Sequence, residues 1–285
     1  MSDTKRKLSS VTWTRNDSYP NMPYRCLMYL QCGVEVFDEI VLVDWCSPNN
    51  VPFVEQYNEY IPKTGKIKSI EISEEKAESI FPLYRDFEKS VSTIMNIGIC
   101  RAEGDFVLSN TVDLITERPN IDDLATDTIY VHGRRGVPEQ DYLHFTDSES
   151  LKNYLMENYL KYPNAPDSVS PTGEPIWDPI DVWSLVVCVG DFQLAHKNVW
   201  NEVRGFEISA AIANDSNLMK KVFTHGLKSS KIDLKAFHLD HIFSHKYISR
   251  EDYLKQQYEN VAIFQKTKNS ENWGLQDVDF KIRTI

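Results

Sequence analysis

The sequence has no long apolar run and no excess of positive charge. None of its apolar stretches reaches the roughly 18 residues that a membrane-spanning helix needs, so we expect no integral membrane segment. The formal net charge is −11, whereas a protein that binds nucleic acid irrespective of its sequence needs a basic surface. The first ten residues are polar and basic, which is unlike a secretory signal. We therefore expect a cytoplasmic protein that does not bind nucleic acid.

Cysteines are few, and glycine-rich phosphate loops are missing. The five cysteines are odd in number and include no Cys-x-x-Cys pair, so neither a disulfide framework nor a structural zinc site is expected. The sequence contains no Gly-x-Gly-x-x-Gly and no Walker pattern. This absence argues against dinucleotide-binding and P-loop proteins.

Segments with the patterns of strands and helices alternate along the first part of the chain. The clearest strand is the apolar, β-branched run Glu39–Asp44. This alternation is typical of a parallel sheet with right-handed crossovers. In a chain of 285 residues, of which 41% are hydrophobic, we expect an α/β fold with a Rossmann-like, mostly parallel central sheet flanked by helices.

The stretch Asn96–Asp113 is the one around which we expect the site to form. Its first half has apolar residues at helical spacing, and Gly104 is placed to end that helix. The buried strand that follows, 106–108, leads into a polar cluster that ends in Asp113. Open α/β sheets bind their ligands at the carboxyl ends of their strands, so Asp113 is expected at the mouth of the sheet.

Three polar clusters follow three predicted strands: Arg15-Asn16-Asp17, Asp44-Trp45 and Thr111-Val112-Asp113. A parallel sheet brings such strand ends to one edge. The carboxylate of Asp44 suits a ribose or uracil, the ring of Trp45 could stack on a base, and Asp113 suits a hard cation such as Mg²⁺ or Mn²⁺. Each acid alone is more simply a solvated loop residue, but three at one edge indicate a site.

Two later segments carry further candidates. His238, His241 and His245 lie within eight residues of one another, with Asp240 between the first two. Ligand and packing roles are both open for His238 and His241, whereas His245 is better explained as a surface residue. Asp215 follows the first residue of a predicted helix, where it is either an N-cap or a general base.

Taken in order, these segments resemble the nucleotide-sugar-dependent glycosyltransferases of the GT-A fold, and among them the soluble enzymes encoded by large algal viruses. The resemblance is carried by TRND, EIVLVDWCSP, NIGICRAEGDFVLSNTVDL, GDFQLAHKNVWNEVRGFE, ANDSNLMKKVFTHG, FHLDH and NWGL, and residues 120–180 show no match. It implies donor-binding roles for Thr14, Arg15, Asn16, Asp44, Trp45, Asn96, Arg101, Thr111, Val112 and Asp113. It also implies that Asp113, His238 and His241 hold a divalent cation, Mn²⁺ or Mg²⁺.

The resemblance implies an inverting, single-displacement transfer of a hexose or pentose from a nucleotide sugar to a glycan or glycoprotein. Asp215 would be the base, with Asp191 as the second candidate. UDP is the favoured nucleotide, and UDP-xylose is a candidate donor. The sequence departs from the family at Thr111, where the family has the first carboxylate of an Asp-x-Asp motif, and metal dependence is therefore open.

We expect one GT-A-like domain, 1–285. It would comprise a nucleotide-sugar-binding half (10–118), an acceptor-binding half (119–245) and a C-terminal helical extension (246–285). We also expect Asp44, Asp113 and a late histidine to line one pocket. The alternative function is an inactive nucleotide- or sugar-binding module on the same fold. A nucleotidyltransferase ranks last, because residues 10–20 lack the glycine-rich, basic loop that it needs.

Overall fold

The computed structural model describes residues 5–15, 21–81, 87–162, 191–208, 214–241 and 269–285. The elements in the first half of the chain are β1 (Leu8–Thr14), α1 (Met22–Val36), β2 (Glu39–Trp45), η1 (Pro48–Asn50), α2 (Phe53–Gln56), η2 (Asn58–Tyr60), β3 (Ile67–Ile72), α3 (Glu74–Ile80), α4 (Phe87–Arg101), β4 (Phe106–Asn110), β5 (Leu114–Thr116), β6 (Thr128–Val131) and β7 (Arg135–Val137). Those in the second half are α5 (Glu139–Tyr142), α6 (Ser148–Glu157), η3 (Tyr159–Lys161), β8 (Phe192–His196), α8 (Lys197–Val203), α9 (Asn214–Thr224), β9 (Lys228–Lys231), β10 (Ala236–Leu239) and β11 (Lys281–Thr284).

The strands form two sheets. The larger sheet has the order β11-β3-β2-β1-β4-β8-β6-β9, and the smaller has the order β5-β10-β7. Strands β3, β2, β1 and β4 run parallel to one another, while β11 and β8 are antiparallel to their neighbours. The predicted α/β class, with a mostly parallel central sheet, is confirmed.

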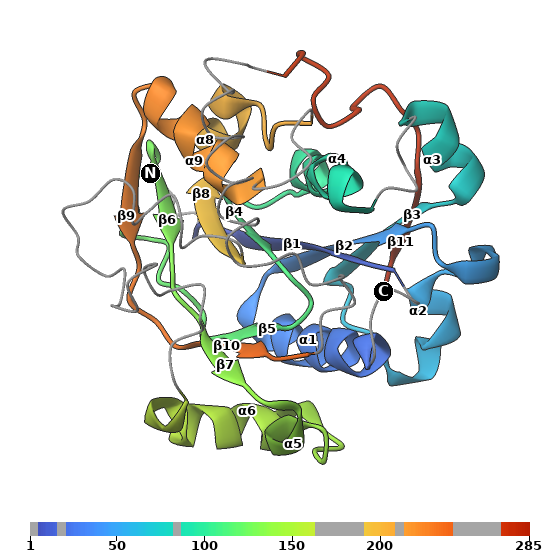
Figure 1. The fold of residues 1–285 in the computed structure, drawn as a ribbon, viewed down its shortest axis with the longest axis vertical. Helices are drawn as coiled ribbons and strands as arrows, with labels where there is room; N and C mark the ends of the chain where they lie inside the picture. Colours follow the sequence, from blue (N-terminus) through green and yellow to red (C-terminus); the bar gives the residue numbers. More distant parts are fainter. Residues whose placement is uncertain (1–4, 16–20, 82–86, 163–190, 209–213, 242–268) are drawn as a thin grey trace, which may run out of the picture.

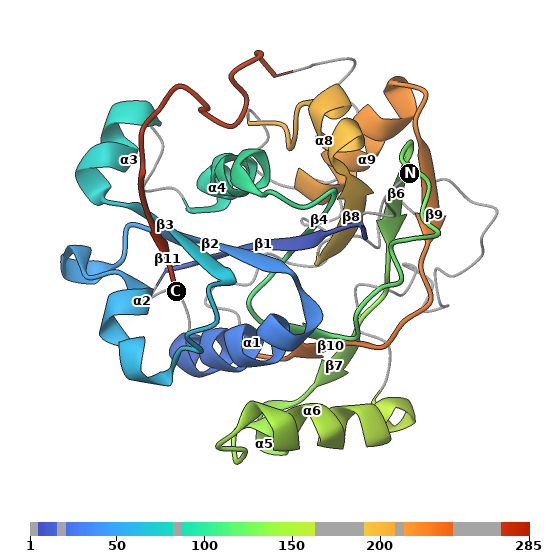
Figure 2. The same ribbon diagram turned by 180° about the vertical axis from the view of Figure 1, so that it is seen from behind.

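Helices cover both faces of the large sheet. Figures 1 and 2 show α3, α4, α8 and α9 on one face and α1 and α2 on the other, with the small sheet, α5 and α6 lying beyond α1. The main hydrophobic core fills the space around the large sheet. A second apolar cluster joins α1, the small sheet and α6. No helix among the described residues is long and apolar enough to cross a membrane.

The buried strands and a helical glycine explain how closely α4 lies against the sheet. In β2, the residues Ile40–Trp45 are all buried, as expected of a parallel strand covered on both faces. Gly98 of α4 faces this sheet, and a Cβ atom there would overlap with Val11 and press on Val43. The glycine therefore allows the helix backbone to rest directly on β1 and β2.

The helix that precedes β4 ends at Arg101, before Gly104 as predicted. A Cβ atom on Gly104 would lie only 2.6 Å from the backbone nitrogen of Ser9. Gly104 also donates its own N–H to Ser9 Oγ at 2.8 Å. This glycine therefore lets the chain approach β1 closely as it turns into β4.

The C-terminal end of the chain differs from the expectation of a helical extension over 246–285. The described residues there begin at 269, and they end in strand β11, which pairs antiparallel with β3. The predicted halves of the domain also share one sheet, because β8, β6 and β9 continue the sheet of β3, β2, β1 and β4. The Pro-rich segment 163–179 lies outside the described residues.

Candidate active site and metal centre

The carboxyl edge of the parallel strands brings together residues from distant parts of the sequence. The chain adds β2 and β3 on one side of β1 and then β4 on the other side, so the topological switch point lies between β1 and β4. Open α/β sheets bind ligands at such a point. Thr14 pairs with Asp44, and Val11 pairs with Ser109. Because neighbouring strands lie roughly 4.8 Å apart, β2 and β4 are separated by about 10 Å across β1.

Asp113 and two late histidines form a compact cluster. Nε2 of His241 lies 3.1 Å from Oδ2 of Asp113, and Nε2 of His238 lies 3.5 Å from the same oxygen. One ligand atom from each residue falls within 4.8 Å of the others. Asp113 is only 7% exposed. The structure therefore brings Asp113 and both late histidines together, and their role as metal ligands stays a prediction.

The pairing of β5 with β10 brings this cluster together. His238 is opposite Leu114, the residue after Asp113, in the antiparallel pair. The N–H of Leu239 donates to the carbonyl of Asp113 at 2.8 Å. His241 lies beyond the end of β10, so the strand alternation that would place it on the opposite face from His238 does not apply. The two imidazole rings lie 5.6 Å apart.

The electrostatics of the cluster are those of a buried ion pair. Burial opposes the charged form of Asp113, but the positive charge of His238 and hydrogen bonds from His238, His241 and Thr111 hold the pKa of Asp113 well below its usual range. Burial likewise lowers the pKa of His238, but the Asp113 charge and hydrogen bonds to Asp113 and Asp240 outweigh it and raise that pKa.

The donor set fits a divalent cation. A carboxylate oxygen and two imidazole nitrogens are chemically suited to Mn²⁺ and to the later first-row metals. Such a cation would replace the histidine proton as the positive charge beside Asp113, because imidazole binds a metal in its neutral form. Thr111 does not supply a further carboxylate: its hydroxyl donates a hydrogen bond to Oδ1 of Asp113, and it therefore supports the ligand beside it.

Asp191, the second candidate for the base, lies at this same edge. Phe192 pairs with Asn110 in the antiparallel pair of β8 and β4, so Asp191 comes next to Thr111. Its carboxylate forms an ion pair with Arg134. The positive charge of Arg134 also acts on His238, where it opposes the rise in pKa. Asp191 and Arg134 therefore border the cluster of Asp113, His238 and His241.

Asp215, the first candidate for the base, lies in the first turn of α9. This helix packs against β9 and α8, on the face of the large sheet that α4 also covers (Figure 1). The side chain of Asp215 is half-buried. Its role as base stays a prediction.

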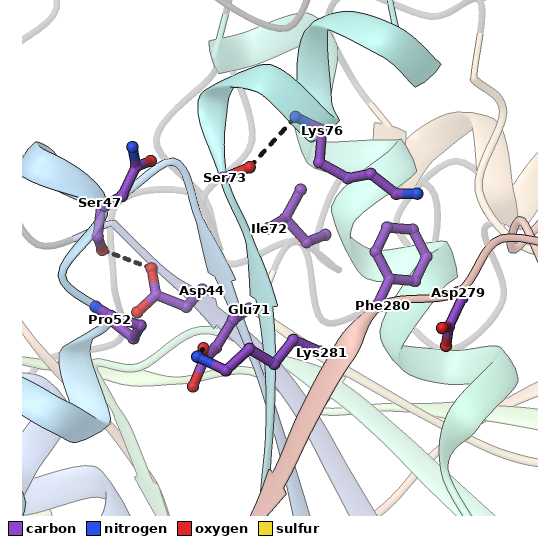
Figure 3. Close-up of a pocket in the computed structure, with 11 residues that line it drawn as sticks. Asp44, Ser47, Pro52, Glu71, Ile72, Ser73, Lys76, Asp279, Phe280 and Lys281 are labelled. Carbon is purple, nitrogen blue, oxygen red and sulfur yellow. Dashed lines mark hydrogen bonds and ion pairs between the residues drawn. The ribbon is translucent and has the colours of Figure 1, made fainter.

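A cleft with a volume of 290 Å³ lies at the carboxyl ends of β2 and β3 (Figure 3). Its lining residues are Asp44, Ser47, Asn50, Pro52, Glu71, Ile72, Ser73, Lys76, Asp279, Phe280 and Lys281. Asp113 is not among them, so this cleft does not extend to the cluster of Asp113, His238 and His241. The expectation that Asp44 and Asp113 line one pocket is therefore not met by this cleft. The two sites are instead neighbours on one edge of the sheet.

Asp44 is the buried acid of this cleft. Only 2% of the residue is exposed, and its carboxylate accepts hydrogen bonds from the hydroxyl of Ser47 and, at 2.5 Å, from the N–H of Phe53. Burial raises the pKa of Asp44 to about 6, and the negative charge of Glu71 adds to the rise, while the two hydrogen bonds oppose it. The predicted place of Asp44 at a ligand-sized cleft is thus supported by the geometry.

Trp45 cannot stack on a nucleobase as predicted, because its side chain is 0% exposed and belongs to the main core. Successive residues of a strand point to opposite faces. Since Asp44 reaches the cleft, Trp45 is directed to the other face of β2, which is also covered. A sequence pattern that places a ring after a strand does not show which face that ring takes.

Asn96 has a structural partner in place of the predicted donor. It is fully buried, its Nδ2 donates to the carbonyl of Phe206 at 2.9 Å, and its Oδ1 accepts from the N–H of Phe206 at 2.8 Å. The side chain therefore satisfies the backbone of the segment that follows α8. The predicted donor-binding role is wrong in this structure.

Arg101 is likewise committed to the protein itself. Its guanidinium donates to the carbonyls of Gly274, Leu275 and Val278 at 2.7–3.0 Å, and it lies over the ring of Phe280 at 4.7 Å from the centroid. These contacts hold the C-terminal segment against α4. The predicted contact with the donor is therefore replaced by a structural one.

The remaining predicted donor residues have mixed outcomes. Thr14 is buried at the end of β1, and Arg15, half-buried after it, is close enough for its charge to act on Cys46. Val112 is buried in the main core, which leaves its backbone as the part able to meet a ligand. Asn16 lies outside the described residues.

The sequence reasoning missed several residues that shape the site. The cleft is lined by Glu71, Lys76 and Lys281. The charge of Arg134 acts on His238 at the edge of the other site. Lys281 reaches the cleft only because β11 pairs with β3, a contact between residues about 200 positions apart that no local pattern reports. Glu71 alone had a usable signal, since it lies near the carboxyl end of β3, whose sequence has the pattern of a strand.

Comparisons with known proteins give distant structural similarity only. No protein-family model and no curated protein sequence matches the chain. Among solved structures, S. aureus TarS 1–349 in complex with UDP is similar at 16% identity with a TM-score of 0.45, over 88% of this chain and 63% of that one. The same protein in complex with UDP-GlcNAc gives 16% and 0.47, over 90% and 66%. A longer TarS structure gives 15% and 0.48, over 90% and 39%. The chain thus spans less than two thirds of each.

Proposed function

We propose that this chain is a glycosyltransferase of the GT-A type that uses a nucleotide-diphosphate sugar. The observation that carries the proposal is the cluster of Asp113, His238 and His241 at the point where the strand order reverses. A buried carboxylate with two imidazoles at that point suits a cation that binds a diphosphate. The cleft beside Asp44 lies about two strands away, which is a suitable distance for the nucleoside of the same donor.

In this proposal the donor lies along the carboxyl edge of the sheet. The nucleoside occupies the cleft, where Asp44 accepts hydrogen bonds from it, and the diphosphate reaches the cluster. The cation held by Asp113, His238 and His241 would offset the negative charge of the leaving diphosphate. Arg15, which follows β1, adds positive charge at the same edge.

The proposed reaction is a single displacement with inversion. An acceptor hydroxyl attacks the anomeric carbon from the side opposite the diphosphate, the bond from that carbon to the diphosphate oxygen breaks, and the carboxylate of Asp215 takes the hydroxyl proton. Asp191 is the alternative proton acceptor. Its carboxylate forms an ion pair with Arg134, and Asp215 remains first because it lies in the segment that resembles the one bearing the base.

Donor and acceptor follow from the resemblance of the sequence. UDP is the favoured nucleotide, UDP-xylose is a candidate donor, and a glycan or glycoprotein is the proposed acceptor, as in the soluble enzymes of large algal viruses that the sequence resembles. We propose a single cytoplasmic domain for the same reason. Whether a hexose or a pentose is transferred is decided by the donor that the protein accepts.

The first experiment is a thermal-shift screen of UDP, GDP and their sugars, with and without Mn²⁺. A ligand at a hundredfold excess over its Kd stabilises the folded protein by about 2.7 kcal/mol. We expect a shift with a UDP sugar that is larger in the presence of Mn²⁺. If no nucleotide or nucleotide sugar changes the melting temperature, the proposal is wrong.

The second candidate function is a nucleotide- or sugar-binding module without activity, which the missing first carboxylate at Thr111 favours. Donor hydrolysis with and without EDTA separates the two functions. A glycosyltransferase releases nucleotide slowly even without an acceptor, and EDTA lowers that release. A module that only binds shows the thermal shift, but it releases nucleotide no faster than the donor hydrolyses in buffer without protein.

A further inference from the structure

Asp240 lies directly behind one of the proposed metal ligands. Its Oδ1 accepts a hydrogen bond from Nδ1 of His238 at 2.8 Å. An ionised carboxylate can only accept, so Nδ1 carries the hydrogen in this contact. The lone pair of the neutral ring is then on Nε2, and Nε2 is the atom that faces Asp113 at 3.5 Å.

The backbone of Asp240 is fixed independently of the cluster. Its N–H donates to the carbonyl of Val137 at 2.8 Å, and its own carbonyl accepts from the hydroxyl of Tyr142 at 2.7 Å. These two contacts come from β7 and α5. The side chain remains 47% exposed, so its carboxylate is positioned without being needed to fill the core.

A glycine on the neighbouring strand makes room for this carboxylate. Gly136 pairs with His238 in the parallel pair of β7 and β10. A Cβ atom at this position would lie 2.6 Å from Oδ2 and 3.0 Å from Oδ1 of Asp240. Any other residue at 136 would therefore displace the carboxylate that contacts His238.

We propose that Asp240 is a positioning residue of the metal site, which holds the ring of His238 with its Nε2 lone pair directed at the cation. This inference rests on the metal site of the proposed function. Carboxylates that hydrogen-bond to a ligating imidazole fix its tautomer and orientation, and their loss typically costs 10- to 100-fold in metal affinity. Gly136 would share this role by keeping the space for the carboxylate free.

The test uses the full chain and Mn²⁺ alone, without nucleotide. Mn²⁺ affinity is measured by calorimetry for the wild type and for Asp240→Ala, and the tautomer of His238 is read by ¹⁵N-edited NMR of the metal-free protein at a pH high enough for the ring to be neutral. We expect the variant to bind Mn²⁺ about 10- to 100-fold more weakly and to lose the preference for hydrogen on Nδ1.

Three further variants sharpen the result. Asp233→Ala removes an exposed carboxylate from the segment that leads into β10 and is expected to leave the affinity and the tautomer unchanged. Asp240→Asn keeps an acceptor oxygen and is expected to retain most of the affinity. Gly136→Ala keeps every ligand and is expected to reproduce the loss by displacing the carboxylate, even if Asp240→Ala does not fold.

The inference is overturned if Asp240→Ala and Gly136→Ala both bind Mn²⁺ within twofold of the wild type. It is also overturned if Asp233→Ala weakens binding as much as Asp240→Ala, because net charge would then explain the effect. A wild type that binds no Mn²⁺ overturns it as well, while glycosyl transfer would still be decided by the screen with nucleotide sugars. A failed screen with intact Mn²⁺ binding leaves the role of Asp240 standing.

Discussion

Glu71 lies directly across from Asp44 in the parallel pair of β2 and β3, so two acids face one cleft from neighbouring strands. Lys281 and Arg283 of β11 form ion pairs with Glu71 at 2.6 and 2.5 Å. Like charges opposite each other on a sheet are destabilising, and β11 supplies the positive charges that offset them. Asp44 accepts hydrogen bonds from Ser47 and Phe53, and its burial raises its pKa.

The first prediction concerns the pH dependence of stability. The folded-state pKa of Asp44 is about 6 against a usual value of 3.8, so its contribution to stability is fully present below pH 3.8 and is lost as the pH rises through 6. The difference of about two units corresponds to about 3 kcal/mol. We expect Asp44→Asn to remove this fall from the free energy of unfolding, measured by urea titration between pH 3.5 and 7. Parallel curves for the two proteins would show that Asp44 titrates normally.

The second prediction restores the missing carboxylate. In Thr111→Asp a second acid would follow β4 beside Asp113, where the hydroxyl of Thr111 now donates to the existing one. Additional carboxylate ligands raise affinity for hard cations, so we expect Mn²⁺ to bind about tenfold more tightly, or about 1.4 kcal/mol. Calorimetry provides the measurement, and Thr111→Ser, which keeps the hydroxyl, is the control. Unchanged binding in Thr111→Asp would place position 111 outside the coordination sphere.

The third prediction distinguishes the two candidate bases. Removing a general base typically slows a reaction by 10²- to 10⁴-fold. We expect Asp215→Ala to lower kcat by this amount with the KM for the donor little changed, and Asp191→Ala to have the smaller effect on kcat. Initial rates of sugar transfer from the donor identified in the screen provide the measurement. If Asp191→Ala shows the larger loss, the base is Asp191, and Asp215 has only a structural role in the first turn of α9.

The fourth prediction concerns the clamp on the C-terminal segment. Arg101→Ala removes the hydrogen bonds to Gly274, Leu275 and Val278, and we expect a loss of about 2–4 kcal/mol in unfolding free energy. Because residues 279–281 form one wall of the cleft, donor affinity should also fall. Hydrogen exchange at the amides of β11 reports the loosening directly. Arg101→Lys keeps the charge but not the fork of donors, and should show an intermediate effect.

The fifth prediction compares two glycines with positive φ. Gly205 has a φ of +61°, and a Cβ atom there would overlap with Asn96 and Trp273, whereas Gly65, at +74°, has open space around it. Replacing either by alanine costs roughly 1–2 kcal/mol for the left-handed backbone. We expect Gly205→Ala to cost at least about 2 kcal/mol more, from the overlap. Thermal unfolding of both variants tests this prediction. Equal losses of stability would mean that Asn96 and Trp273 move aside at little cost.

Local patterns predicted much of the fold correctly. The apolar run of β2, the helix that ends at Arg101 and the buried strand β4 all follow from residue spacing, because a chain must bury its apolar face whatever its partners are. The same reasoning placed Asp113 at the carboxyl edge of the sheet. The pairing of His238 and His241 with Asp113 was open in the sequence, since it depends on where β10 ends.

The wrong predictions for Asn96 and Arg101 have one physical cause. Asn96 and Arg101 have the donors and acceptors expected of ligand-binding residues, but their hydrogen bonds go to Phe206 and to Gly274–Val278, more than 100 positions away in the chain. A polar side chain that is removed from water must be satisfied by something, and its sequence neighbourhood does not say whether that is a substrate or another part of the backbone.

The sequence by itself thus determined the α/β class, the parallel strands and the edge at which Asp44 and Asp113 lie, because hydrophobic periodicity and strand direction are local properties. Only the tertiary structure decided which polar groups remain at that edge. The pairing of β5 with β10 brings the imidazoles of His238 and His241 to Asp113, with Asp240 behind His238. The pairing of β3 with β11 forms one wall of the cleft beside Asp44. Both pairings join segments more than 100 residues apart, so no local pattern encodes them.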